Sequence, residues 1–137
     1  MQVTDCHSNW LKMNHSATAN EIIEVTQEEL SRASLQKTPQ EVLAVFVQPS
    51  YDLNPEVIKS SLCLALDDVQ DPGNLGTIIR LADWFGIEHI FCSAGTADVY
   101  NPKTVQATMG ALARVKVHYC SLPQLIESLA DIPVYGT

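Results

Sequence analysis

Blocks of apolar and polar residues alternate along the second half of the chain and predict strands and helices in turn. The apolar run at residues 62–66 predicts a strand buried on both faces, as in a parallel sheet that is covered on both sides. A polar loop, residues 67–74, follows it. Apolar side chains spaced three or four residues apart then predict a helix from about Leu75 to Phe85, and we expect Gly86 to end this helix.

One face of this helix is apolar and should pack in the core. It consists of Leu75, Ile78, Ile79, Ala82 and Phe85. Arg80 falls roughly opposite that face if each residue turns the helix by about 100°. Trp84 follows one turn later on the same side. The packing of the core therefore leaves Arg80 free for another role.

The same alternation continues to the end of the chain. Residues 87–91 and 115–119 predict a second and a third strand, and residues 133–135 begin a fourth. Helices are expected at residues 102–108 and 122–129, each opened by an Asn or Ser and a proline in the first turn. Strands that alternate with helices in this way predict a parallel α/β fold.

The first fifty residues carry a weaker pattern. Residues 21–25 and 42–47 predict short strands, with a helix at residues 27–35 between them. Thr26 and Glu29 have the spacing of a capping box at the start of that helix. A linker with two prolines follows the second strand and suggests a domain boundary between residues 50 and 56.

Length and composition set outer limits. The chain has 137 residues, which is enough for one domain or for one domain and part of another, and 46% of them are hydrophobic. No apolar run approaches the roughly 18 residues of a membrane span, and no signal-peptide pattern opens the chain. The four cysteines include no C-x-x-C pair, and the histidines lack ligand spacing, so we expect no metal site. Scattered cysteines suit a reducing cytoplasm.

The net charge of -8 opposes a nucleic-acid function, because such proteins usually carry a basic patch. Lys and Arg number only 8 and do not cluster in the sequence. An RNA-binding surface would have to lie outside this chain or consist of a small local group. Lys103, Arg114 and Lys116 are candidates for that group, although each taken by itself fits an ordinary solvated charge better.

The loop after the first strand is the place to look for chemistry, because ligands of open α/β sheets bind beyond the carboxyl ends of the strands. Neither G-x-G-x-x-G nor G-x-x-x-x-G-K-[ST] occurs there, so the two common phosphate-binding loops are not supported. The loop and helix read D-D-V-Q-D-P-G-N-L-G-T-I-I-R-L-A-D-W-F-G, residues 67–86. This segment resembles the first signature motif of the SpoU (TrmH-type) RNA 2′-O-ribose methyltransferases.

The resemblance extends through N-P-K-T-V-Q-A-T-M-G-A-L-A-R-V-K-V, residues 101–117. The matching positions of the first motif are Asp71, Pro72, Asn74, Gly76, Arg80, Ala82 and Gly86. SpoU enzymes belong to the SPOUT superfamily, whose Rossmann-like parallel sheet carries a deep trefoil knot near its C-terminus. The resemblance implies S-adenosylmethionine as methyl donor, a ribose of rRNA or tRNA as acceptor, and a homodimer.

The resemblance also implies a domain organisation. Residues 1–50 resemble part of a small, ribosomal-protein-like RNA substrate-binding domain, and residues 56–137 resemble the N-terminal part of a SpoU methyltransferase domain. The second and third signatures of the family, a G-N-E-x-x-G loop and an S-L-N-V segment, do not occur here. We therefore expect an incomplete α/β-knot sheet that is inactive alone, with Gly136 and Thr137 at the edge of an incomplete donor pocket.

Arg80 and Asn74 are the candidate catalytic residues by this resemblance. An arginine is a poor base because its pKa exceeds about 12. It is better suited to bind an RNA phosphate or to lower the pKa of the ribose hydroxyl. A structural alternative for Arg80 is an ion pair with Asp83 or stacking on Trp84. Asn74 would position the arginine and the loop, and it also suits the cap of a helix that starts at Leu75.

Two other functions stay open on the sequence alone. The chain could be a non-catalytic RNA-binding or dimerisation module, or a Rossmann-like nucleotide-binding domain unrelated to methyl transfer. The absent glycine fingerprint argues against the second of these. Trp84, off the core face, could mark either a subunit interface or a contact within the chain.

Overall fold

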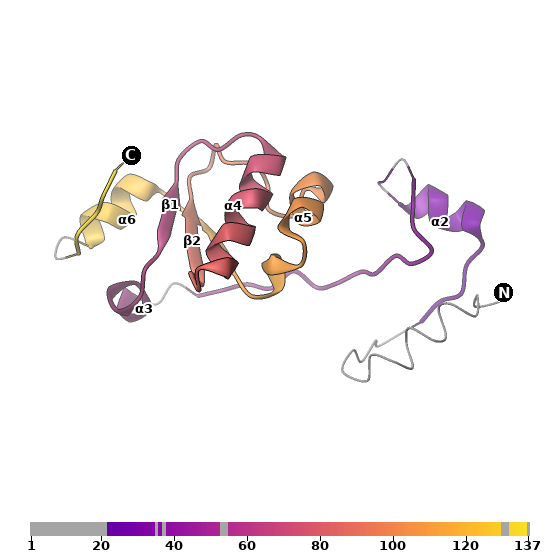
Figure 1. Cartoon of the computed structure of the whole chain (residues 1–137), viewed down its shortest axis with the longest axis horizontal. Coiled ribbons are helices and arrows are strands. Elements are labelled where there is room, and N and C mark those ends of the chain that lie inside the picture. The colour runs from indigo at the N-terminus through magenta and orange to yellow at the C-terminus, as the bar shows by residue number, and fades with distance from the viewer. Residues whose placement is uncertain (1–21, 35, 37, 53–54, 130–131, 137) are drawn as a thin grey trace. The chain divides into compact units, whose positions relative to one another are not determined.

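The computed structural model describes residues 22–34, 36, 38–52, 55–129 and 132–136. The chain separates into two compact units, Met1–Gln48 and Pro49–Thr137 (Figure 1). The first unit contains helix α2 (Gln27–Ala33), which is close to the predicted helix. Its capping box is confirmed: the hydroxyl of Thr26 accepts from the Glu29 N–H, and the Glu29 carboxylate accepts from the Thr26 N–H at 2.8 Å. The likeness of this unit to a substrate-binding domain stays a prediction.

The two strands predicted for the first unit are wrong within the described residues, since 22–25 and 42–47 form no strand. The apolar residues of the second segment are exposed, and Val47 is 96% exposed. An apolar, β-branched run favours a strand only when a neighbouring strand offers hydrogen bonds and side-chain contacts. No such neighbour is present in the part of the first unit that the structure describes.

The second unit is built on a parallel three-stranded sheet in the order β1-β2-β3, which confirms the predicted fold class. The strands are β1 (Leu64–Leu66), β2 (His89–Cys92) and β3 (Lys116–Tyr119). Ile90 of β2 pairs with Leu64 on one side and with Val117 on the other. All four residues of β2 are buried, as expected for a central strand covered on both faces.

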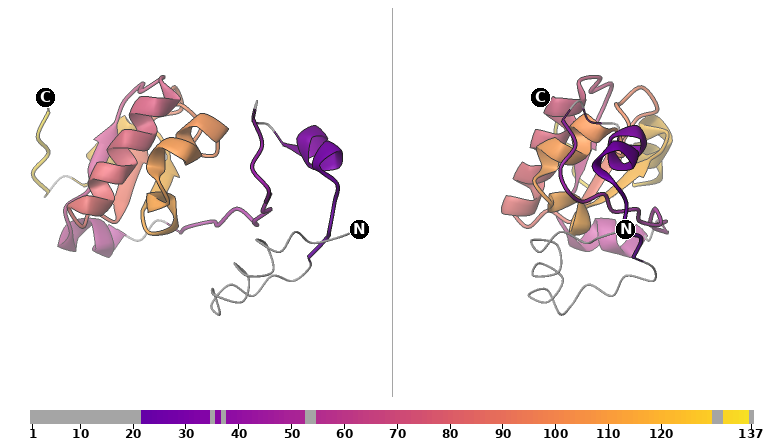
Figure 2. Two further views of the ribbon diagram at one scale, coloured as in Figure 1. Left: turned by 45° about the vertical axis from the view of Figure 1, so that its right-hand side comes forward. Right: turned by 90° about the vertical axis from the view of Figure 1, so that its right-hand side faces the viewer.

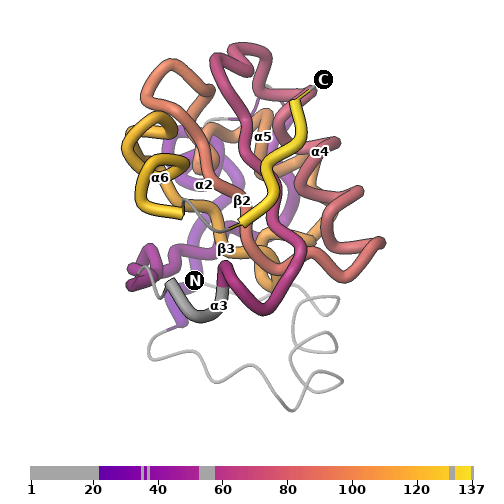
Figure 3. Tube along the Cα trace, turned by 90° about the vertical axis from the view of Figure 1, so that its left-hand side faces the viewer, coloured from indigo at the N-terminus to yellow at the C-terminus, as the bar shows by residue number. Residues whose placement is uncertain are grey.

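Helices cover both faces of this sheet (Figure 3). Helices α4 (Pro72–Trp84) and α5 (Pro102–Thr108) lie on one face, and α3 (Pro55–Ser60) and α6 (Leu122–Ser128) contribute to the other. The short 3-10 helix η1 (Ala111–Ala113) joins α5 to β3. The core under α4 consists of Leu75, Ile79, Ala82, Ile87, Ile90, Cys92, Val99, Ala111 and Val115, and the core of the other face of Ile58, Phe91, Leu122 and Leu129.

Strand β1 is less buried than predicted. Leu64 and Leu66 are half-buried, Ala65 is exposed, and Leu62, predicted to begin the strand, precedes it and is 72% exposed. The reason is that β1 lies at an edge of the sheet, where only one neighbouring strand is present among the described residues. The predicted fourth strand is also wrong, because residues 132–136 form no strand in the structure.

Helix α4 begins three residues earlier than predicted, at Pro72. Its N-cap is Asp71, whose carboxylate oxygen Oδ1 accepts a hydrogen bond from the Asn74 N–H at 2.8 Å. The prediction that Asn74 caps the helix is therefore wrong: Asp71 takes that position because Pro72 has a fixed φ suited to the first turn. Phe85 is also not a core residue. It is the C-cap, 74% exposed, where the periodicity of the helix stops.

Helices α4 and α5 lie side by side (Figure 2), and Gly76 makes their close approach possible. A Cβ atom at Gly76 would lie 2.6 Å from the Cβ atom of Ala107 and 2.6 Å from the carbonyl oxygen of Thr104. Such distances are well inside van der Waals contact, so only glycine fits without movement of α5. The start of α5 also agrees with the sequence, since Asn101 caps it and accepts from the Lys103 N–H at 2.9 Å.

Candidate functional site

The loops after β1 and β2 are tied together at the carboxyl edge of the sheet. The hydroxyl of Ser93 accepts a hydrogen bond from the Asp68 N–H at 2.9 Å. The carbonyl of Val69 accepts from the Ala97 N–H at 2.9 Å. These bonds join segments about 25 residues apart in the sequence and hold the edge as one surface. Asp68 has a φ of 55°, a left-handed conformation that a non-glycine residue adopts at a cost.

Tyr119, a partly exposed residue at the end of β3, holds the second of these loops. The hydroxyl of Tyr119 donates to the carbonyl of Ala97 and accepts from the Val99 N–H at 2.8 Å. Burial raises the pKa of Tyr119 to about 12, so the hydroxyl stays protonated and able to donate at neutral pH. The loop that leads into α5 is therefore fixed by β3.

The first turn of α4 is linked to the first turn of α5 by an ion pair. The Asp71 carboxylate uses Oδ1 to cap α4 and Oδ2 to accept from Lys103 Nζ at 2.9 Å. The hydrogen bond from Lys103 is the main reason that the pKa of Asp71 lies below its usual value, and the bond from the Asn74 N–H adds to it. Asp71 therefore remains ionised and keeps both contacts well below neutral pH.

Arg80 lies on α4, exposed to solvent and without a hydrogen-bond or ion-pair partner in the described part of the chain. The alternative pairing with Asp83 is wrong, because Arg114 binds that carboxylate through two hydrogen bonds. Arg114 Nε lies 2.8 Å from Asp83 Oδ1, and its second nitrogen lies 2.6 Å from Oδ2. This pairing lowers the pKa of Asp83 and raises that of Arg114. The guanidinium of Arg80 is therefore available to a ligand.

Asn74 and Arg80 both lie on α4 and are exposed, but their side chains form no hydrogen bond with each other. Six residues separate them, which turns the helix through roughly 600° and places them on different sides of its outer surface. Gly136 is exposed in the segment after α6, and Thr137 lies outside the described residues. The structure thus joins Asn74 to the carboxyl edge but does not bring the four candidate residues into one described contact.

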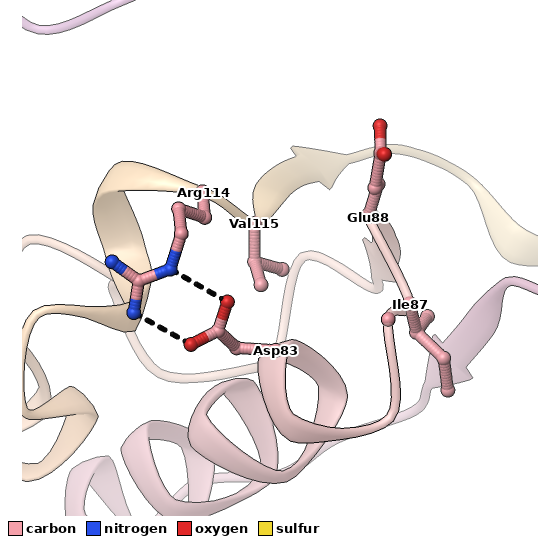
Figure 4. Close-up of a pocket in the computed structure, with 6 residues that line it drawn as sticks. Asp83, Ile87, Glu88, Arg114 and Val115 are labelled. Atoms are coloured by element: carbon pink, nitrogen blue, oxygen red, sulfur yellow. Dashed lines mark hydrogen bonds and ion pairs between the residues drawn. The ribbon is translucent and has the colours of Figure 1, made fainter.

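The basic residues proposed as a cluster do not form one. Lys103 lies at the carboxyl edge, whereas Arg114 and Lys116 lie at the amino end of β3. Lys103 and Arg114 also have acidic partners. A cavity of about 390 Å³ is lined by Asp83, Gly86, Ile87, Glu88, Arg114 and Val115 (Figure 4). It lies at the amino ends of β2 and β3, opposite the edge where ligands of parallel sheets bind, and we assign it no catalytic role.

The cysteines of the second unit differ in their burial. Cys92 is buried, and burial raises the pKa of its thiol to about 11, which agrees with an inert core residue. Cys63 is only half-buried. Among the described residues there is no group of three or more His, Cys, Asp or Glu side chains able to hold a metal ion. None of the described helices is long and apolar enough to cross a membrane.

The sequence missed the interactions that hold the site. Asp71 and Lys103 are 32 residues apart, and neither residue type by itself indicates a partner at that distance. A local signal for the Asp71 cap was present, because Asp71-Pro72 has the same form as Asn101-Pro102, which was read correctly as a helix start. The sequence did not indicate the role of Tyr119, since a tyrosine near the end of a strand is common and does not by itself point to a hydrogen-bond partner.

Comparisons with known proteins agree with the motif. The model of the SpoU rRNA Methylase family matches residues 61–137, more than half of the chain. The 23S rRNA (guanosine(2553)-2′-O)-methyltransferase RlmP of Bacillus subtilis (strain 168) is 35% identical over 115 residues, which cover 82% of this chain and 45% of that protein. The 23S rRNA (uridine(2479)-2′-O)-methyltransferase of Streptomyces viridochromogenes is 38% identical over 77 residues, which cover 56% of this chain and 27% of that protein.

A solved structure is similar as well. A candidate RNA methyltransferase of the TrmH family from Porphyromonas gingivalis superposes with a TM-score of 0.65 at 37% sequence identity. The match covers 89% of this chain and 49% of that one. The chain thus spans less than half the length of each of these relatives.

Proposed function

The chain belongs to the SpoU rRNA methylase family, and from this we propose that the protein carrying it transfers a methyl group from S-adenosylmethionine to a ribose 2′-hydroxyl of RNA. The observation that carries the proposal is Arg80: it falls at the family's motif position and is exposed without a partner in the described residues. The activity is proposed for the whole protein, because this chain spans only part of its relatives.

Arg80 would act on the acceptor. A guanidinium is a poor general base, so we do not assign Arg80 the removal of the hydroxyl proton. It can bind a phosphate next to the target ribose through two parallel N–H···O bonds, which fixes the position of the 2′-hydroxyl. Its charge also favours the alkoxide that develops as the hydroxyl loses its proton. Both effects need an arginine with no competing carboxylate, and Asp83 is already bound by Arg114.

Asn74 would bind the acceptor RNA from the first turn of α4, on a different side of the helix from Arg80. Its backbone N–H is bound to Asp71, but its side chain makes no hydrogen bond within the described residues. An amide offers two donors and one acceptor oxygen, which suits a ribose hydroxyl. The carboxyl edge of β1, where α4 begins, is also the end at which parallel sheets bind ligands.

S-adenosylmethionine supplies an electrophilic sulfonium methyl group when it is bound. Gly136 has open space within 4 Å of the position of a Cβ atom, so its backbone is accessible to a ligand. We propose that Gly136 and Thr137 lie at the edge of the donor site. The rest of that site would come from sequence that carries the family's second and third signatures, so we propose that these 137 residues alone are inactive.

We also propose a homodimer that forms through α4. Leu81, Trp84 and Phe85 are exposed large hydrophobic residues on or next to this helix, and Trp84 is 84% exposed. Adjacent apolar side chains of this size are the kind of anchor that protein interfaces use. We propose separately that the protein is cytoplasmic. The bacterial rRNA methyltransferase relative and the free thiols support this location.

The test is methyl transfer from S-adenosylmethionine labelled at its methyl group. The protein carrying this chain is incubated with ribosomal RNA, with transfer RNA and with a DNA oligonucleotide. Labelling of one of the two RNAs alone is the expected result, and it identifies the substrate class. Labelling of no RNA, in the presence of measured binding of the donor, would contradict the proposal.

A further inference from the structure

A lysine outside the first signature motif contacts the start of the motif helix. Lys103 is the second residue of α5, and its Nζ lies 2.9 Å from Oδ2 of Asp71. The other carboxylate oxygen, Oδ1, accepts from the Asn74 N–H at 2.8 Å. One carboxylate therefore connects the lysine on α5 to the backbone of Asn74 on α4.

The lysine side chain is guided into this position by its surroundings. The Asn101 carboxamide binds the Lys103 N–H at 2.9 Å and sets the first turn of α5. The aliphatic stem passes close to Gly73, where a Cβ atom would lie 3.3 Å from Lys103 Cε. Loop 93–101 is itself fixed by Tyr119, so a continuous set of contacts runs from β3 to the first turn of α4.

We propose that Lys103 is a positioning residue: through Asp71 it holds the first turn of α4 and thereby sets the place of Asn74 at the reaction site. The inference rests on the proposed function for its catalytic consequence. The contact that it invokes stands on the geometry alone. Lys103 here is a structural partner of Asp71, not a free contact for the RNA backbone, which is the role that its charge suggests in the sequence.

The alternative role predicts different measurements. A lysine that binds an RNA phosphate contributes to affinity and to its salt dependence, and its loss lowers the salt slope by about 1. A lysine that positions Asn74 contributes to the chemical step after RNA is bound. Its loss lowers kcat and leaves KM for RNA unchanged.

The experiment replaces Lys103 by Met, which keeps the unbranched stem beside Gly73 and removes the charge. Lys103→Arg keeps the charge and should rescue most of the loss. Lys116→Met is the matched control, because this lysine lies at the opposite end of the sheet. Two measurements are made on this chain: the titration of the Asp71 carboxyl by carbon NMR and the hydrogen exchange of the Asn74 amide. Methyl-transfer kinetics are measured on the whole protein.

We expect Lys103→Met to raise the pKa of Asp71 and to speed exchange of the Asn74 amide several-fold. We expect kcat to fall about tenfold with KM for RNA unchanged. Asp71→Asn should lower kcat to a similar extent. The double variant should lose little more activity than either single variant, because both residues act through one contact. Lys116→Met should leave all three quantities unchanged.

Two results would overturn the proposal. One is an Asn74 amide that exchanges its hydrogen at the same rate in Lys103→Met as in the wild type. The other is a raised KM with a lower salt slope and unchanged kcat, which would make Lys103 an RNA contact. A wild-type protein that transfers no methyl group would contradict the proposed function instead, and the Asp71 titration and the Asn74 exchange would then decide the role of Lys103.

Discussion

Arg80 and Asp71 show how pairing decides what a charged residue can do. Arg80 is exposed on α4 and has no partner in the described residues, whereas Asp71 uses both of its oxygens in contacts within the fold. A paired charge at a surface contributes little to stability, because solvent screens it. Its value here is geometric, because it fixes where the first turn of α4 lies. The unpaired charge is the one free to act on a substrate.

Replacement of Arg80 should separate charge from geometry. We expect Arg80→Ala to lower kcat roughly a hundredfold, the range seen when one preorganised donor is removed from an active site. Arg80→Lys keeps the charge but loses the bidentate fork, so we expect an intermediate loss. The measurement is methyl transfer under saturating donor. Arg32→Ala, on α2 and paired with Glu28, is the control. Equal activity of Arg80→Ala and wild type would remove Arg80 from the mechanism.

Asp68 offers a test of backbone strain beside the site. Its φ of 55° is costly for any residue with a Cβ atom, and its carboxylate accepts from the Gln70 amide at 3.1 Å. Asp68→Gly and Asp68→Ala both lose that bond, so the difference between them reports the backbone. We expect the glycine variant to be the more stable by about 1 kcal/mol in chemical denaturation. An alanine variant of equal or greater stability would show that the position is not strained.

At the scale of elements, local pattern predicted helices α2, α4, α5 and α6 and the three strands of the sheet in their correct order. The parallel sheet, the helix containing Arg80, and the caps Thr26 and Asn101 followed from periodicity and from short-range residue preferences. The errors fall where distant partners decide. Val47 needs a neighbouring strand to become part of a sheet, and the burial of Leu62 depends on what covers the edge of β1.

The candidate site was predictable only in part for the same reason. The position of Arg80 on the outer side of its helix follows from periodicity, and its role follows from resemblance to a motif. The start of α4 at Pro72 depends on the Asp71 cap, and the orientation of Asp71 depends on Lys103, 32 residues away. No local property of Asp71 or Lys103 indicates that the two residues are in contact.

The close contact between α4 and α5 should make one added methyl group at Gly76 destabilising. A Cβ atom at Gly76 would overlap the backbone of Thr104 and the side chain of Ala107. We expect Gly76→Ala to lower the free energy of unfolding by about 1–3 kcal/mol, despite the better helix propensity of alanine. The measurement is urea denaturation, with Gly136→Ala as control because nothing lies near its Cβ position. Unchanged stability would mean that the two helices separate without cost.

The face of the sheet covered by α6 carries a pair of buried histidines that respond to pH. On the face covered by α6, His89 Nδ1 lies 3.0 Å from His118 Nε2, and the His118 ring stacks on Phe91. Burial lowers the pKa of both imidazoles below 6.5, and nearby Lys116 lowers both further, while Glu88 opposes the change at His89. The folded state therefore binds fewer protons than the unfolded chain in mild acid.

Stability should therefore be constant above about pH 6.5 and should fall as the pH drops below it. The measurement is the midpoint of urea unfolding at several pH values between about 5 and 8, the range in which histidines ordinarily titrate. His118→Phe, which keeps a stacking ring but cannot be protonated, should flatten the dependence. A variant as sensitive to acid as the wild type would assign the effect to other groups.

At the scale of the whole molecule, the outer surface of α4 carries both the candidate arginine and an exposed tryptophan, Trp84. Trp84 follows Arg80 by one turn. A second copy seated on Trp84 would therefore bring its own residues close to Arg80.

The proposed dimer is tested by Trp84→Ala. We expect the protein carrying this chain to sediment as a dimer and the variant to dissociate at least tenfold more readily, since a buried tryptophan anchor contributes about 2 kcal/mol or more to an interface. Tyr135→Ala, which also removes an exposed aromatic residue, is the control. A wild-type monomer at high concentration would contradict the dimer but not the methyl transfer.

The position of the transferred methyl group tests the central claim most directly. RNA that has been incubated with the protein and S-adenosylmethionine is digested to nucleosides and analysed by mass spectrometry with fragmentation. We predict that the added mass stays with the ribose, as a 2′-O-methyl nucleoside, and that it is absent when the donor is omitted. A methyl group found on the base, or no modified nucleoside from an RNA that the protein binds, would contradict the account.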